Sequence, residues 1–148
     1  MPTANLDLTT RASFKHWTPV TIRFSDTDQL GHINNCAYAT YFEASRVAYI
    51  DQLFERDRMA KAAFNTVLVR LLIDYKRELH YPGLVEVGAR LIKLGGKSFT
   101  TGYGCFQGEV CVAVCEAVNV CFDVAERRSI LPPESFRERL RAELAGAG

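Results

Sequence analysis

The chain has 148 residues, of which 48% are hydrophobic, with 18 basic and 17 acidic side chains, and this balance predicts one compact domain spanning residues 1–148. A formal net charge of +1 gives no reason to expect nucleic acid or an anionic membrane surface as a partner. Because the sequence holds no apolar run of membrane-spanning length and its N-terminus lacks the apolar stretch of a secretory signal, we expect a cytoplasmic protein.

The first predicted elements are a strand and a long helix, separated by a polar turn. Val20, Ile22 and Phe24 alternate with polar residues, which is the period of a strand with one buried face. From about Asn35 to Arg58, apolar residues recur at spacings of three and four, so we expect a helix that is buried over much of its circumference. The predicted inward face of this helix consists of Tyr38, Tyr41, Phe42, Ser45, Tyr49 and Leu53.

The second half of the chain alternates with the period of two that strands require. The predicted strands cover Thr66 to Leu79, Leu84 to Leu94, Phe99 to Cys105 and Val110 to Phe122. Glycine-containing turns such as Gly95-Gly96 join them. Short turns between consecutive strands favour an antiparallel meander, so the sequence predicts an α+β fold.

Alternation also predicts which residues share a face of these strands. In the first of the four strands, the residues expected on one face are Val67, Val69, Leu71, Ile73 and Tyr75. In the last strand, Cys111, Cys115 and Cys121 are expected on one face. With Cys36 and Cys105 these make five cysteines without the paired spacing of a zinc site, so we expect buried hydrophobic side chains rather than metal ligands or a catalytic thiol.

A charged segment follows Pro132-Pro133 and carries a narrow apolar stripe. Phe136, Leu140 and Leu144 recur at helical spacing. We therefore expect a C-terminal helix that packs on an outer surface of the domain.

The turn between the first strand and the long helix concentrates side chains that can do chemistry. It contains two carboxylates, an imidazole and two amides, which belong to Asp26, Asp28, His32, Asn34 and Asn35. Either asparagine is a good N-cap, and the unpaired N–H groups of a helix start can stabilise an acyl oxygen that gains negative charge. Taken alone, the two aspartates also fit a turn whose carboxylates bond to their own backbone.

These residues belong to a longer ordered pattern that continues into the helix. The pattern consists of Phe24-Ser25-Asp26-Thr27-Asp28, Gly31-His32-Ile33-Asn34-Asn35, Tyr38, Tyr41-Phe42-Glu43 and Arg46. It resembles the motif of the hotdog-fold acyl-CoA thioesterases of the 4-hydroxybenzoyl-CoA thioesterase type. The resemblance implies a single hotdog domain in which an antiparallel sheet of about five strands wraps a long central helix. It also implies a homo-oligomer, either a dimer or a dimer of dimers that makes a homotetramer.

The resemblance further implies an acyl-CoA thioester hydrolase whose catalytic carboxylate is Asp28. His32 is expected to support Asp28, and Asp26 is expected to be structural. The expected substrate contacts are Asn35, Tyr38, Lys97 and Ser98. Arg127 and Arg128 are either contacts to the phosphates of coenzyme A or solvated surface arginines. No metal and no separate cofactor are expected, because coenzyme A is part of the substrate.

Two routes for Asp28 and two other functions stay open at this point. Asp28 either activates water as a general base or attacks the thioester carbonyl as a nucleophile. The main alternative function is a non-catalytic module that binds acyl-CoA or an acyl-carrier protein and uses Asp28 for turn stability. A hotdog hydratase or dehydratase, with Asp28 and His32 aimed at carbons of the acyl chain, ranks third.

Overall fold

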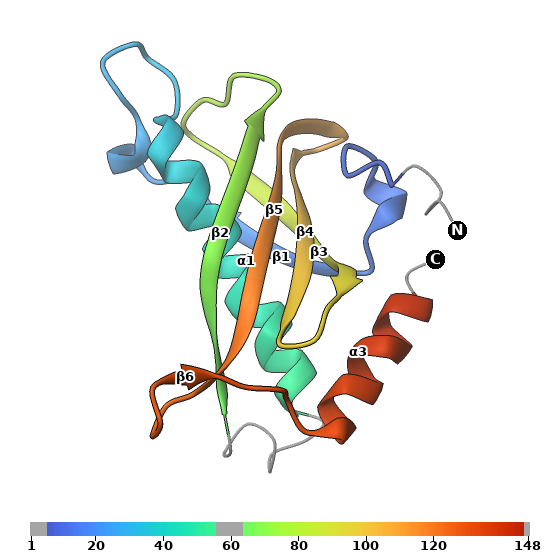
Figure 1. Ribbon diagram of the computed structural model, residues 1–148. Helices are drawn as coiled ribbons and strands as arrows, with labels where there is room; N and C mark the ends of the chain where they lie inside the picture. The colour runs from blue at the N-terminus through green and yellow to red at the C-terminus, as the bar shows by residue number, and fades with distance from the viewer. Residues whose placement is uncertain (1–5, 56–63, 147–148) are drawn as a thin grey trace.

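The computed structural model describes residues 6–55 and 64–146, and these form a long helix with a sheet curled around it (Figure 1). The long helix is α1 (Asn35–Glu55), and a second helix, α3 (Glu134–Gly146), follows the sheet. The strands are β1 (His16–Thr21), β2 (Asn65–Tyr75), β3 (Leu84–Leu94), β4 (Ser98–Gln107), β5 (Val110–Asp123) and the two-residue β6 (Arg128–Ser129).

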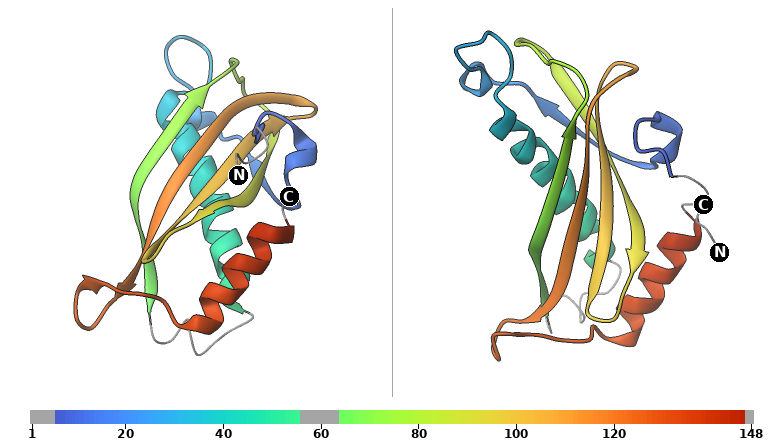
Figure 2. Two further views of the ribbon diagram at one scale, coloured as in Figure 1. Left: turned by 45° about the vertical axis from the view of Figure 1, so that its right-hand side comes forward. Right: turned by 45° about the horizontal axis from the view of Figure 1, so that its top comes forward.

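All strand pairs are antiparallel, and the sheet order is β1-β3-β4-β5-β2 with β6 beside β5. The inner face of the sheet and α1 enclose the main hydrophobic core. Two further views show that the sheet curves around one side of α1 and that α3 lies beside one end of the sheet (Figure 2). This is the hotdog arrangement, and the predicted α+β fold is confirmed.

Helix α1 begins at Asn35 as predicted and buries its predicted inward face. All six residues of that face are at most 3% exposed. The side of the helix that faces away from the core carries Glu43 and Val47, both exposed. The predicted end of the helix at Arg58 lies outside the described residues, so that boundary stays a prediction.

The N-terminal segment covers part of the outer face of the sheet. Leu8 and Phe14 flank the short 3₁₀ turn η1 (Arg11–Ser13) and form a second, smaller cluster with Phe106 and Val114. The sheet is therefore packed with apolar side chains on both faces over this region.

The strand before the polar turn ends earlier than predicted. It gives way to a 3₁₀ turn, η2 (Phe24–Asp26), because the carboxylate of Asp26 accepts a hydrogen bond from the N–H of Arg23 at 2.9 Å. Phe24 consequently turns outward and is 74% exposed, whereas Ile22 is 2% exposed. The prediction that Phe24 shares the buried face of the strand with Ile22 is therefore wrong.

A β-bulge in β2 changes which of its residues face α1. The pairing register with β5 shifts between Leu68 and Arg70. After the shift Leu71 pairs with a core residue, whereas Val67 pairs on the opposite face with Val120. The prediction that Val67 and Leu71 share a face is wrong, because a bulge adds one residue to the strand and reverses the alternation beyond it.

A second bulge, at Val112, separates the three cysteines of β5. The register of the β4–β5 pair shifts there, so Cys111 packs with the outer cluster. Cys115 and Cys121 lie in the main core, on the inner face. The prediction of one shared cysteine face is wrong for Cys111 and correct for the other two.

Helix α3 packs into the core more deeply than predicted. Phe136 and Leu140 are fully buried, and the Phe136 ring stacks on Phe54 with ring centroids 4.9 Å apart. Phe99 of β4 meets the same ring edge to face. The apolar stripe of α3 therefore completes the main core at one end of the sheet instead of covering an outer surface. No helix in the described part of the chain is long and apolar enough to cross a membrane.

Candidate active site

Asp26 anchors the polar turn to α1. Its side chain is almost fully buried and accepts hydrogen bonds from the guanidinium of Arg23, at 2.8 and 3.1 Å, and from the hydroxyl of Tyr41, at 2.7 Å. Burial alone raises the pKa of the Asp26 carboxyl, but these hydrogen bonds and the charge of Arg23 outweigh burial and lower it below its ordinary value. Asp26 is thus a buried, fully bonded anion with a structural role.

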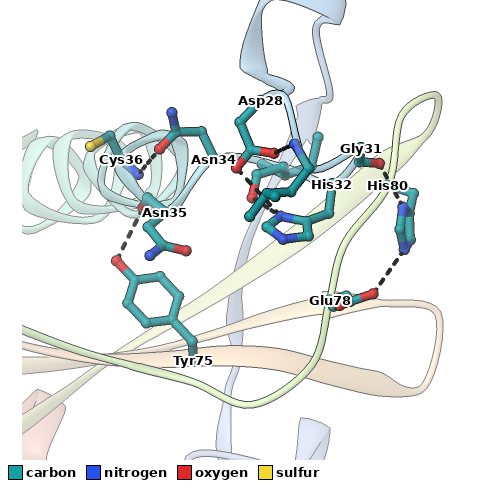
Figure 3. Close-up of polar contacts among 11 residues, drawn as sticks. Asp28, Gly31, His32, Asn34, Asn35, Cys36, Tyr75, Glu78 and His80 are labelled. Carbon is teal, nitrogen blue, oxygen red and sulfur yellow. Dashed lines mark hydrogen bonds and ion pairs between the residues drawn. The ribbon is translucent and has the colours of Figure 1, made fainter.

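Asp28 lies on the loop that follows this anchor. The loop closes through the N–H of Asp28, which donates to the carbonyl of His32 at 3.0 Å, and it turns at Gly31, whose φ of 85° lies in the left-handed region. Oδ1 of Asp28 accepts a hydrogen bond from the N–H of Leu30 at 2.9 Å. Oδ2 lies 3.5 Å from Nδ1 of His32 (Figure 3). One carboxylate oxygen therefore holds the loop, and the other faces the imidazole.

The surroundings of His32 indicate which ring nitrogen carries the proton. Nδ1 lies 3.2 Å from the carbonyl oxygen of Ile33 as well as near Asp28. Both neighbours are acceptors, which favours the proton on Nδ1 of the neutral ring and leaves Nε2 as an acceptor. The side chains of His32 and Asp28 are 24% and 23% exposed, so a small molecule can reach the pair.

The start of α1 lies beside this pair. Oδ1 of Asn34 accepts a hydrogen bond from the N–H of Cys36 at 3.0 Å, so Asn34 is the N-cap. Asn35 is the first helical residue, and its N–H has no carbonyl one turn earlier in the helix to bond. The carbonyl of Asn35 accepts a hydrogen bond from the hydroxyl of Tyr75 at 3.1 Å, which ties the helix start to the end of β2. The site therefore combines a carboxylate, an imidazole and the positive end of a helix dipole.

An open cavity of about 280 Å³ lies between the start of α1 and the end of β2. It is lined by His32, Ile33, Asn35, Tyr38, Tyr75, Lys76, Arg77 and Glu78. Tyr38 is 3% exposed and meets the ring of Tyr75 edge to face at 5.1 Å, and burial raises the pKa of Tyr38 to about 12. The structure thus brings His32, Asn35 and Tyr38 to one cavity. Asp28 does not line this cavity and lies behind His32, with Oδ2 3.5 Å from Nδ1.

Half of this lining was not predicted as part of a site. Tyr75 was assigned only to a strand face, and Lys76, Arg77 and Glu78 received no role. The N–H groups of Lys76 and Arg77 both donate to the carbonyl of Val112, at 2.8 and 3.1 Å, so this segment is fixed where it leaves β2. The feature of the sequence that could have indicated this part of the site is the charged run Lys76-Arg77-Glu78, which directly follows an apolar strand.

Two predicted substrate contacts, Lys97 and Ser98, lie at the other end of the sheet from this cavity. Lys97 and Ser98 belong to the β3–β4 hairpin, which Figure 1 shows at the opposite end of the sheet from the polar turn. Arg137 of α3 donates to the carbonyls of Gly95 and Gly96, at 3.1 and 2.7 Å, and holds this hairpin. Arg127-Arg128 follows β5 at the same end. The structure does not bring these residues together with Asp28, and their contacts to substrate stay a prediction.

Cys105, Cys115 and Cys121 behave as packing residues, whereas Cys36 at the start of α1 is exposed, so the expectation of burial is wrong for Cys36. Burial raises the pKa of the thiols of Cys105, Cys115 and Cys121 to about 12, so they stay protonated and are poor nucleophiles. Within residues 6–55 and 64–146, no group of three or more His, Cys, Asp or Glu side chains is placed to hold a metal ion.

Comparison with known proteins gives one family and several similar structures. The family model of the thioesterase-like superfamily matches residues 22–140. A predicted thioesterase from Bacillus stearothermophilus superposes with a TM-score of 0.77 at 31% identity, over 86% of this chain and 95% of that one. A thioesterase from Thermus thermophilus, in complex with coenzyme A and zinc, superposes with a TM-score of 0.76 at 30% identity, over 90% and 96% of the two chains. The uncharacterized protein YsmA of Bacillus subtilis is 29% identical over 108 residues, which are 68% of this chain and 72% of YsmA.

Proposed function

Because the chain belongs to the thioesterase-like superfamily, we propose that it hydrolyses an acyl-CoA thioester to a free acid and coenzyme A. Within the superfamily, the ordered motif that includes Asp28 and Gly31-His32-Ile33-Asn34-Asn35 supports an assignment to the 4-hydroxybenzoyl-CoA thioesterase type. The similar Thermus thermophilus thioesterase that binds coenzyme A supports the same substrate class.

The observation that carries this proposal is the Asp28–His32 pair beside the start of α1. A thioester seated in the cavity places its carbonyl oxygen toward the N–H of Asn35, where the helix dipole stabilises the negative charge that develops during attack. One well-placed donor of this kind is worth about 3 kcal/mol in the transition state. The thiolate is a good leaving group, so a carboxylate, oriented donors and a binding cavity form a sufficient set.

Asp28 can act in either of two ways from this position. As a general base, Oδ2 takes a proton from a water molecule that attacks the carbonyl carbon, the C–S bond breaks, and the sulfur of coenzyme A leaves with a proton. As a nucleophile, Oδ2 attacks the carbonyl carbon directly, the C–S bond breaks, and coenzyme A leaves as the thiolate; water then hydrolyses the acyl anhydride. In both routes His32 lies beside Oδ2, with Nδ1 3.5 Å away, and helps to orient it. In a single turnover in ¹⁸O-labelled water, label in the Asp28 carboxyl group would establish the anhydride, because the general-base route puts the label only in the released acid.

The charges around the cavity support a particular direction for the substrate. Lys76 and Arg77 are exposed at its edge, where they can pair with the phosphates of coenzyme A. Tyr38 and Tyr75 line the space between this edge and the helix start, so their rings can contact the pantetheine arm or the first carbons of the acyl group. Lys97 and Ser98 then become contacts only if a second chain contributes them.

The exposed edge of the sheet supports a homodimer. Strand β2 is the last strand in the sheet order, and six of its apolar side chains are at least 36% exposed. An apolar edge strand pairs readily with another strand, and an isologous antiparallel pair of β2 strands closes both edges at once. In such a pair the partner's β2 runs beside the whole edge strand, including its end at Tyr75, so the cavity lies close to the junction of two subunits. We infer a dimer, or a dimer of dimers, on this basis.

Replacement of Asp28 tests the proposed hydrolysis. Asp28→Asn keeps the size of the side chain and its hydrogen bond to Leu30, but it neither attacks a carbonyl nor accepts a proton from water. We expect kcat for hydrolysis of the best acyl-CoA in a panel to fall by about 10²-fold or more. The matched control is Asp123→Asn at the far end of β5, where the carboxylate caps the N–H of Glu126. An Asp28→Asn enzyme as fast as the control would refute the role of Asp28.

One observation favours a non-catalytic acyl-CoA or acyl-carrier-protein binding module instead. Oδ1 of Asp28 is bonded within its own loop, as in a turn that a carboxylate merely stabilises. The wild-type protein decides between the two functions. The panel contains acyl-CoAs with short, medium and long chains and with aromatic rings. If calorimetry detects binding of an acyl-CoA and no member of the panel releases free thiol, the protein is a binding module.

A further inference from the structure

A second cavity, of about 250 Å³, also lies between α1 and β2, farther from the polar turn. It is lined by Arg46, Val47, Ile50, Asp51, Asn65, Thr66, Leu68 and Asn119. Arg46 lies about 16 Å beyond Asn35 along the helix, at a rise of about 1.5 Å per residue. On the inner face of β2, the part-exposed side chain of Leu71 lies between the two cavities. An acyl chain that extends from the thioester site along α1 therefore passes over apolar surface and then reaches this polar cavity.

The guanidinium of Arg46 lines this second cavity together with the carboxylate of Asp51. Its side chain is 12% exposed, and the nearest carboxylate described is that of Glu43, 3.6 Å away on a side chain that is 63% exposed. At that distance the pair makes no hydrogen bond. The positive charge also acts on the core, because it opposes the effect of burial on the pKa of Cys115. A guanidinium this deeply buried is costly unless a hydrogen-bonding anion pairs with it.

The wall opposite Arg46 is polar as well. Asn119 is 1% exposed, and its amide nitrogen donates to the carbonyls of Phe99 and Ala117 and to the hydroxyl of Thr101, at 3.1 to 3.4 Å. These bonds fix the side chain, and its remaining amide oxygen is an acceptor that binds a donor rather than a carboxylate. Asp51, the other charged residue of the cavity, already has an interaction of its own. Recognition of an anion in this cavity therefore rests on the Arg46 guanidinium, which a purely hydrocarbon acyl chain would leave without a hydrogen-bonding anion.

We propose that Arg46 selects acyl groups whose far end carries a carboxylate. This inference rests on the proposed thioesterase function and names its substrate class: ω-carboxyacyl-CoA thioesters of medium chain length. The terminal carboxylate pairs with the Arg46 guanidinium in a bidentate geometry, which Glu43 does not achieve. The apolar middle of the chain covers Leu71.

The test compares two acyl-CoA series of equal length that end in a carboxylate or in a methyl group. For the wild-type enzyme, the ratio of kcat/KM for the carboxylate-ended to the methyl-ended substrate should exceed one at medium length and fall at short length. Arg46→Met should lower this ratio by about tenfold or more, which corresponds to about 1.4 kcal/mol. Arg46→Lys should retain part of the preference, because it keeps the charge but loses the bidentate geometry.

Two controls separate this inference from a structural role of Arg46 and from failure of the proposed function. Arg141→Met removes an exposed arginine on α3 and should leave the ratio unchanged. If Arg46→Met lowers kcat/KM equally for both series, or if the wild-type ratio is one or less at every length, the inference is overturned. If wild type hydrolyses neither series, the wider acyl-CoA panel decides on the thioesterase function, and the affinities for non-hydrolysable thioethers of both series still decide on Arg46. Equal affinities overturn the inference in that case too.

Discussion

The hydroxyl of Tyr41 donates a hydrogen bond to the carboxylate of Asp26 at 2.7 Å, and this contact joins the second turn of α1 to the loop that carries Asp28. Both groups are buried, at 1% and 3% exposure. Since the carbonyl of Asp26 also accepts a hydrogen bond from the N–H of Asn34 at 2.8 Å, the same residue holds the helix cap. The position of Asp28, the proposed catalytic carboxylate, relative to the helix start therefore depends on a neighbouring carboxylate with a structural role.

Tyr41→Phe should destabilise the protein by about 2 kcal/mol, because it leaves a charged, buried acceptor with one hydrogen bond fewer. Urea denaturation followed by circular dichroism measures this change in the free energy of unfolding. Tyr81→Phe, at a side chain that is 45% exposed, serves as the control and should change stability little. Equal stabilities of Tyr41→Phe and wild type would show that the hydrogen bond contributes nothing to the anchor.

His32→Gln should lower kcat by about tenfold to a hundredfold, which is less than the loss in Asp28→Asn. Glutamine keeps a donor near Oδ2 of Asp28 but lacks the rigid ring that the carbonyl of Ile33 orients. Because the two residues act as a unit, the double variant should be about as slow as Asp28→Asn alone. Steady-state kinetics of the four proteins form the cycle, and fully additive losses would mean that His32 acts independently of Asp28.

Leu72→Lys should convert the proposed dimer to a monomer. Leu72 is 42% exposed on the edge strand β2, where a lysine disfavours pairing with a second strand. Its cross-strand neighbour Glu116 can pair with the new charge, so the fold of one chain should persist. Light scattering measures the mass, and Leu131→Lys, at a residue that is 63% exposed outside β2, is the control. If the site lies at the subunit junction, hydrolysis falls together with the mass.

The sequence predicted the element order well, because long amphipathic patterns are local properties of the chain. The inward face of α1 follows directly from the spacing of its aromatic residues, and all of them are buried. The errors occur where one residue interrupts a pattern. The bulges at Val112 and near Leu68 reverse the alternation beyond them, and no residue type at either position announces the change.

The candidate site was only partly predictable for a different reason. Asp28, His32 and Asn35 form one contiguous motif, so their proximity follows from local geometry. Tyr75 lies forty residues beyond Asn35 and reaches it only because β2 ends opposite the helix start. Arg46 belongs to the same motif, but its burial depends on how β2 and β5 pass beside α1. Such contacts are properties of the whole fold and cannot be counted along the chain.

A third cavity, between α3 and the β1–β3 edge, leads to a prediction about acid stability. It contains His16, whose Nδ1 is buried without a hydrogen-bond partner in the described residues. Burial lowers the pKa of His16, and the negative charge of Glu143 on α3 acts in the opposite direction. Lys15 and Arg90 also line this cavity and disfavour a further positive charge.

The sign of the effect follows from comparison with the unfolded chain, in which the pKa of His16 is near its ordinary value of 6.5. Below that pH the unfolded state binds a proton more readily than the folded state, so the free energy of unfolding should fall on acidification from about 6.5 until the lower folded-state pKa is reached. His16→Gln should flatten this part of the stability curve, whereas His80→Gln, with a side chain that is 60% exposed, should not. Urea denaturation at pH values on both sides of 6.5 measures the curves. A His16→Gln curve as steep as that of wild type would show that the buried imidazole is not the group responsible, because no other change separates the two proteins.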